Sequence, residues 1–178
     1  MSSNIITILG IDPGSRITGY GIIRSNGQKH TYVTSGTVNT KGDNITTRLA
    51  QIFSSIQTLT QTYRPDEAAI EQVFMAKDAN AALKLGQARG AAIVAMANEG
   101  LTVAEYAARA VKQAVVGYGA ADKAQVQQMV KLLLNLTKTP TTDAADALAV
   151  AICHAHSRQM NALLQAQPST TRMRETFL

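Results

Sequence analysis

The chain has 178 residues, 46% of them apolar and 16% charged, a balance that excludes a disordered or fibrous protein. With 17 Lys and Arg against 12 Asp and Glu, the net charge of +5 favours an anionic partner without identifying it. A single cysteine excludes an internal disulfide, and no apolar run reaches the roughly 20 residues of a transmembrane helix. The N-terminus also lacks the basic and apolar segments of a signal peptide, so we expect a soluble, cytoplasmic protein.

The first forty residues predict three strands. Residues 5–11 form a nearly continuous, β-branched apolar run, typical of a strand buried on both faces, and the run ends in the turn sequence 12–15. A second strand is expected at 19–24, and the hairpin dipeptide Asn26-Gly27 leads into a third at 30–40. Because the links are short, we expect an antiparallel meander.

Helices and strands alternate after residue 44. Apolar residues at helical spacing predict a helix from Ile45 that ends at Arg64-Pro65-Asp66. The elements expected after it are a strand at 68–73, an Ala-rich helix at 80–98, a strand at 102–106, and helices near 108–116, 122–135 and 142–157. This order predicts one α/β domain over residues 1–157, with a mixed five-stranded sheet flanked by helices. Residues 158–178 are expected to form a C-terminal tail.

Four acidic residues stand where a carboxylate is costly without a partner. Asp12 ends one apolar strand, Glu71 interrupts another, and Asp143 and Asp146 share one face of the last helix. Ordinary structural roles exist for three of them, since Asp12 suits a turn and the helical pair suits a first turn. Glu71 does not fit such a role, because a carboxylate between apolar strand residues must be paired or must bind something.

A divalent cation is the simplest partner that these four acids can share. If the two acid-bearing strands are sheet neighbours, their carboxylates meet at one edge, where the start of the last helix can add the other two. Mg²⁺ prefers oxygen ligands and often bridges carboxylates to phosphate. A cluster of this kind can hold two ions ~4 Å apart, with Mn²⁺ as a substitute, and hydrolyse a phosphodiester. The sequence contains no Cys/His spacing typical of zinc.

Basic residues surround this predicted acidic cluster in the sequence. Between Lys77 and Lys138 there are eight basic residues and four acids, and several of the basic residues lie at helix starts or in loops. Such positions contact phosphates easily, although a solvated basic face would show the same pattern. An acidic cluster with basic surroundings is more specific than either feature, and it indicates metal-dependent chemistry on a polyanion.

Five short blocks carry a resemblance to a known family. They are Gly10–Ser15, Glu71–Lys77, Leu85–Gly90, Glu105–Arg109 and Asp143–Ala149. In order and spacing, over about residues 5–157, these blocks resemble the RuvC family of bacterial Holliday-junction resolvases. The resemblance implies an RNase H-like fold, a homodimer, and Mg²⁺-dependent nicking of two opposed strands at a four-way junction during recombination and repair. It also implies sealable 5′-phosphate and 3′-hydroxyl ends and a partnership with the RuvA and RuvB branch-migration complex.

The resemblance also implies roles for individual residues. The residues that match the catalytic, metal-binding acids of the family are Asp12, Glu71, Asp143 and Asp146. Phe74 matches an aromatic residue that stacks on a base near the crossover, and its alternative is a place in the core. Lys112 and Lys123 match lysines that stabilise charge at the scissile phosphate, and their alternative is ordinary solvation. Lys77 and Arg89 are further candidates for DNA contact.

The Ala-rich segment 80–98 offers a surface for the implied dimer. Gly86 and Gly90 lie four residues apart, so two such helices could approach closely, or the helix could pack closely on its own sheet. A two-fold dimer supplies two identical sites, which matches the approximate two-fold symmetry of a four-way junction.

Two alternative functions stay open at the level of sequence. Gly10–Ser15 and the following hairpin also resemble the phosphate loop of actin-like ATPases and sugar kinases, but those proteins need two lobes and this length supplies one. The other alternative is a non-catalytic junction-binding module that uses the basic face alone. The four acids argue against it, because they would only repel DNA.

Overall fold

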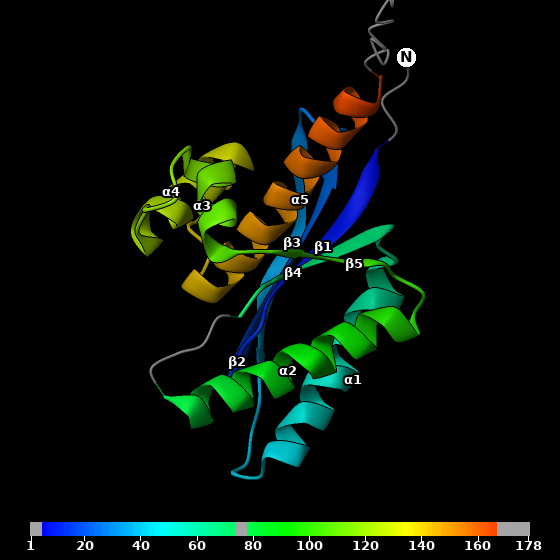
Figure 1. The fold of residues 1–178 in the computed structure, drawn as a ribbon, viewed down its shortest axis with the longest axis vertical. Coiled ribbons are helices and arrows are strands. Elements are labelled where there is room, and N and C mark those ends of the chain that lie inside the picture. Colours follow the sequence, from blue (N-terminus) through cyan, green and yellow to red (C-terminus); the bar gives the residue numbers. More distant parts are fainter. Residues whose placement is uncertain (1–4, 74–77, 167–178) are drawn as a thin grey trace, which may run out of the picture.

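The computed structural model describes residues 5–73 and 78–166, which form a mixed five-stranded sheet with helices on both faces (Figure 1). The strands are β1 (Ile6–Asp12), β2 (Ile17–Ser25), β3 (His30–Asn39), β4 (Glu67–Glu71) and β5 (Val103–Tyr106). The helices are α1 (Ile45–Tyr63), α2 (Ala79–Asn98), α3 (Ala108–Val116), α4 (Lys123–Leu133) and α5 (Thr142–Ala166). The predicted order of elements is confirmed.

The sheet order β3-β2-β1-β4-β5 places the N-terminal strand in the middle. Strands β1, β2 and β3 form the expected antiparallel meander, and β4 and β5 run parallel to β1. A parallel pair needs a crossover, which α1 and α2 provide between these strands. The fold therefore joins an antiparallel edge to a parallel half, as in the RNase H-like architecture implied by the resemblance.

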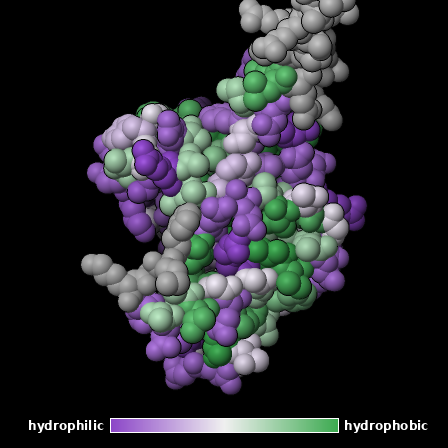
Figure 2. Space-filling view, in the orientation of Figure 1, coloured by the Kyte–Doolittle hydropathy of each residue, from purple (hydrophilic) through white to green (hydrophobic). Residues whose placement is uncertain are grey.

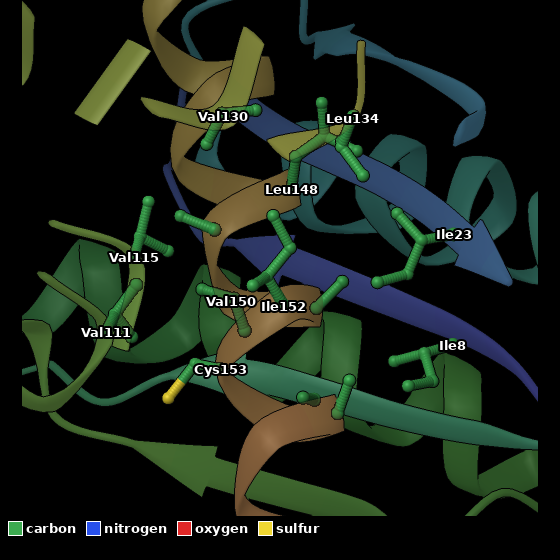
Figure 3. Packing of buried hydrophobic residues seen from close by; sticks show 14 of the residues in the cluster. Ile8, Ile23, Val111, Val115, Val130, Leu134, Leu148, Val150, Ile152 and Cys153 are labelled. Carbon is green, nitrogen blue, oxygen red and sulfur yellow. The ribbon is translucent and has the colours of Figure 1, made fainter. Parts of the chain in front are cut away.

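Alternating residues of β1 supply two separate hydrophobic cores. Ile6 and Ile8 face α5 and pack with side chains from α3, α4 and β2, whereas Leu9 and Ile11 face α1 and α2. In Figure 3, α5 passes between the strands and helix α3, with its own apolar side chains pointing to both. Because both faces of the sheet are covered, β1 reads as a continuous apolar run in the sequence.

Helix α5 lies unusually close to the sheet because glycines face it. A Cβ on Gly10 would stand 2.2 Å from the backbone oxygen of Ala147, and one on Gly19 would stand 2.0 Å from that of Asp143. No side chain fits at such distances, so the first turns of α5 rest directly on the backbones of β1 and β2. This contact brings the acidic start of α5 to the end of β1.

Helix α5 continues to Ala166, beyond the end at residue 157 that the sequence predicted. No helix-breaking residue occurs before Pro168, and Arg158 is held by a 2.8 Å hydrogen bond from its Nε to Glu67. Residues 158–166, which were expected to belong to the tail, are therefore helical, and 167–178 lie outside the described residues. Within the described ranges, the helices are all too short or too polar to span a bilayer.

We predict that Gly10→Ala lowers the free energy of unfolding by at least about 2 kcal/mol, because the new methyl group meets backbone atoms that cannot move aside. Gly86→Ala is the control, since its methyl group meets nothing within 4 Å. Urea denaturation of the two variants measures the difference. Equal free energies of unfolding would show that the close approach of α5 is not a constraint.

Candidate active site

Two of the predicted acids end neighbouring strands at the same edge of the sheet. The parallel register between β1 and β4 pairs Ile11 with Ile70, so Asp12 and Glu71 are the next residues on the two strands. The sequence predicted this meeting on the condition that the two strands are sheet neighbours, and the structure meets that condition. Each carboxylate is half-buried at the last residue of its strand.

A pocket of about 220 Å³ opens at this edge, and α5 contributes a third acid, Asp146, to its wall. The charged lining residues are Asp12, Glu71, Asp146, Lys112 and Lys123. Its remaining lining residues are Ala108 and Val111 of α3 and Val126 of α4. Five residues that are distant in the sequence, all predicted to be functional, therefore surround one cavity.

Burial and mutual repulsion raise the pKa values of the three pocket acids. Burial is the largest cause of the rise in the Asp12 pKa, from 3.8 to about 8, and the charge of Glu71 is the next. Burial also raises the pKa of Glu71 and of Asp146, and each of these acids is further affected by another carboxylate. The pocket thus concentrates negative charge that is only partly compensated, which favours binding of a cation.

The two lysines compensate part of this negative charge. Lys123 Nζ lies 3.9 Å from Asp146 Oδ2, and the side chain is 73% exposed at the start of α4. The charges of Lys112 and Lys123 lower the pKa of Glu71, against the larger effect of burial. Positive charge therefore borders the acidic pocket, and on Lys123 it is exposed to solvent.

Asp143 lies beside the pocket rather than in its lining. Its backbone oxygen is the group that comes closest to the missing Cβ of Gly19, one helical turn before Asp146. Its charge still contributes to the raised pKa of Asp12 and of Asp146. Three of the four predicted acids thus share the cavity, and the fourth acts on it from the adjacent turn.

The donor chemistry of the pocket fits a hard divalent cation. All of its acidic groups are carboxylates, which are the ligands that Mg²⁺ prefers, and burial keeps their pKa values raised even though the charges of the two lysines oppose the rise in Glu71 and Asp146. In the ranges 5–73 and 78–166, no three His, Cys, Asp or Glu side chains already stand close enough together to hold a metal ion. Ligation by these acids would therefore draw their side chains closer.

The remaining predicted DNA contacts lie elsewhere. Phe74 and Lys77 fall outside the described residues. Arg89 on α2 forms an ion pair with Glu105 of β5, its side chain is 21% exposed, and it does not line the pocket. The structure therefore gives Arg89 a role in joining α2 to β5, and its contact with DNA stays a prediction.

Sequence reasoning missed the network at the far end of β4. His154 donates a hydrogen bond from Nε2 to a carboxylate oxygen of Glu67 (2.7 Å), and its Nδ1 is hydrogen-bonded to the Tyr106 hydroxyl (2.9 Å). Arg158 binds the other oxygen of the same carboxylate. A histidine beside small apolar residues was the available signal, but its partners come from two strands that lie 48 and 87 residues away in the chain.

Comparisons with known proteins identify the family of the chain. Residues 8–154 match the family model described as Crossover junction endodeoxyribonuclease RuvC. Curated proteins of that name from Tolumonas auensis and Pseudoalteromonas atlantica are 62% and 60% identical over 152 residues, covering 85% of this chain and 88% of each relative.

Solved structures give the same result. Thermus thermophilus RuvC in complex with Holliday junction substrate superposes with a TM-score of 0.82 at 32% identity, covering 88% of this chain and 96% of that one. The yeast mitochondrial Holliday junction resolvase Ydc2 superposes with a TM-score of 0.62 over 89% of this chain and 85% of that one. Because the two chains are 12% identical, this likeness supports the fold alone.

We predict that Asp12→Asn stabilises the metal-free chain in a pH-dependent way. In the wild type, the folded-state pKa of Asp12, about 8, exceeds the ordinary value of 3.8. The stability that a protonated Asp12 contributes is therefore fully present below about pH 4 and is lost as the pH rises through 8. The uncharged amide does not titrate. The Tm of the Asp12→Asn variant should therefore exceed that of the wild type by about 5 °C or more at pH 9, and this difference in Tm should close toward pH 4.

Differential scanning calorimetry with a chelator present measures this gap. Asp43→Asn is the control and should show no such trend, since this carboxylate is fully exposed outside the pocket and its one ion pair, with Arg48, is long at 3.9 Å. A gap for Asp12→Asn that is the same at pH 5 and pH 9 would contradict the electrostatic account of the pocket.

Proposed function

The chain belongs to the RuvC family, the crossover junction endodeoxyribonucleases, and we propose that it resolves Holliday junctions by Mg²⁺-dependent paired nicking of two opposed DNA strands. The observation that carries this proposal is the pocket in which three carboxylates from β1, β4 and α5 face two lysines. The Thermus relative was solved with Holliday junction substrate, and we extend that substrate to this chain. We further propose action in the cytoplasm, with the RuvA and RuvB complex as a partner.

The four acids have distinct positions for one task. Asp12, Glu71 and Asp146 would hold Mg²⁺ at the sheet edge, with Asp143 adding charge from the adjacent turn. When bound, such ions lower the pKa of a coordinated water and neutralise charge on phosphate oxygens. The half-buried position of the carboxylates keeps bulk water from competing for them. Two ions per site fit this number of acids.

The lysines would act on the DNA rather than on the metal. Lys112 and Lys123 line the same pocket from α3 and α4, so a phosphodiester entering it passes between them and the acids. In the reaction, the water oxygen bonds to phosphorus, the bond from phosphorus to O3′ breaks, and the leaving oxygen takes up a proton. This leaves a 5′-phosphate and a 3′-hydroxyl. The lysines stabilise the charge that develops on the phosphate during this exchange.

The two alternative functions lose support. The family match over residues 8–154 is to crossover junction endodeoxyribonucleases, which leaves the actin-like ATPase without support. A non-catalytic junction-binding module does not explain three carboxylates with raised pKa values in a pocket. Relatives at about 60% identity over most of the chain carry the name of an endodeoxyribonuclease.

We propose that two copies of the chain pair through α2. An added Cβ at Gly86 or Gly90 would meet nothing within 4 Å, so neither glycine is needed for packing on the sheet. Leu83 and Val94 are 67% and 57% exposed at the same helical spacing. Figure 2 shows hydrophobic surface over α2, whereas the region of α3 and α4 is mainly hydrophilic. This apolar stripe with small residues at its centre suits a two-fold helix contact.

We predict that Asp12→Asn and Glu71→Gln abolish cleavage, by at least about 10³-fold, and retain junction binding, because each amide removes a metal-binding charge but keeps the shape. End-labelled four-way junctions, incubated with Mg²⁺ or with a chelator, measure nicking, and gel shifts without metal measure binding. Asp43→Asn should nick normally. A variant that cuts at nearly the wild-type rate would refute the role of that acid.

The dimer proposal has its own test. Leu83→Glu together with Val94→Glu should give a monomer in sedimentation experiments, since like charges would face each other across the two-fold axis. Leu163→Glu, on an equally exposed part of α5, should stay dimeric. A double variant that keeps the wild-type mass would place the interface elsewhere.

A further inference from the structure

A large groove on the described surface is separate from the candidate active site. This groove has a volume of about 640 Å³ and lies between β3 and the α4–α5 connection. It is lined by Lys29, His30, Thr31, Tyr32, Ser35 and residues 134–140. None of these residues lines the acidic pocket. We propose that this groove binds the sugar–phosphate backbone of a DNA arm away from the scissile phosphate, an inference that rests on the proposed function.

The positive charge of the groove favours an anionic ligand. Lys29 and Lys138 stand on opposite walls of the groove, and both side chains are exposed. No Asp or Glu is among the lining residues, and neither lysine forms an ion pair with any group in residues 5–73 or 78–166. Threonine hydroxyls and the Asn135 amide add neutral hydrogen-bond donors. Both lysines are thus available for phosphate.

His30 adds no positive charge to the groove near neutral pH. His30 is hydrogen-bonded at both ring nitrogens, by Nδ1 to Ser25 Oγ (2.9 Å) and by Nε2 to His156 Nε2 (3.0 Å). Burial lowers the His30 pKa to about 4, so the ring is neutral near pH 7. The aromatic ring of Tyr32, which is 38% exposed, supplies a flat apolar wall suited to a deoxyribose.

Size and donor arrangement favour a polymer backbone over a small anion. The groove is about three times as large as the acidic pocket, and its lysines are spread over two walls instead of converging on one point. Spread cations and hydroxyls are typical of phosphate contacts that position DNA without reading its sequence. A four-way junction extends well beyond the cleaved bond, so the groove can contact the backbone of one of its arms at a distance from that bond.

The groove is joined to the active site by rigid structure. Its α4–α5 wall follows the helix that carries Lys123 and precedes the helix that carries Asp146. Gln127 of α4 fixes this wall by donating a 3.1 Å hydrogen bond to the backbone oxygen of Pro140. A strand held in the groove would therefore keep a set position relative to the acids.

The test removes both groove lysines from the full-length chain. Lys29→Gln with Lys138→Gln should weaken binding of a labelled four-way junction about tenfold in chelator. The slope of log K against log salt concentration should fall by nearly 2, as for two lost phosphate contacts. The matched control, Lys41→Gln with Lys84→Gln, removes equal charge from exposed sites outside the groove.

The outcomes separate this inference from the proposed function. Unchanged affinity and salt slope would overturn the groove as a DNA site and would fit a protein partner instead. An equal loss in the control variant would also overturn it, because the effect would then come from net charge. A wild-type chain that never nicks would overturn the proposed function, while weaker binding by the groove variant alone would still support the groove.

Discussion

The contact between α5 and the backbones of β1 and β2 is the constraint on which the candidate active site depends. Glycines at positions 10 and 19 leave room for the helix backbone itself, so the start of α5 lies directly on the strand that ends in Asp12. The carboxylates are thereby fixed by packed backbone rather than by flexible loops. Close packing of this kind transmits small changes in volume directly to the acidic pocket.

Folding brings the acids together at an electrostatic cost. The raised pKa values of Asp12, Glu71 and Asp146 measure that cost, because each carboxyl holds its proton more tightly than it would in water. The apolar packing of α5 between the sheet and α3 offsets it (Figure 3). A site that is strained without a cation is suited to bind one strongly, since the cation relieves the strain.

The sequence predicted the element order, the mixed sheet and the family, because periodicity and the acidic motifs are local patterns. It also anticipated the meeting of Asp12 and Glu71, which follows once two buried strands are taken as parallel neighbours. It did not predict the pairing of Arg89 with Glu105 or the groove beside β3, because these depend on tertiary contacts between distant segments. The predicted end of α5 at residue 157 was too early, since no breaker residue occurs there or between there and Pro168.

The network at Glu67 has a mechanical consequence for the whole domain. Strand β4 carries Glu67 at one end and Glu71 at the other, while α5 carries Asp146 near its start and His154 and Arg158 two to three turns later. The contacts of His154 and Arg158 with Glu67 thus join β4 to α5 at the end of the strand that is remote from the acids. A shift of α5 along β4 would have to break these contacts with Glu67. They therefore help to keep the distance between Glu71 and Asp146 constant from outside the acidic pocket.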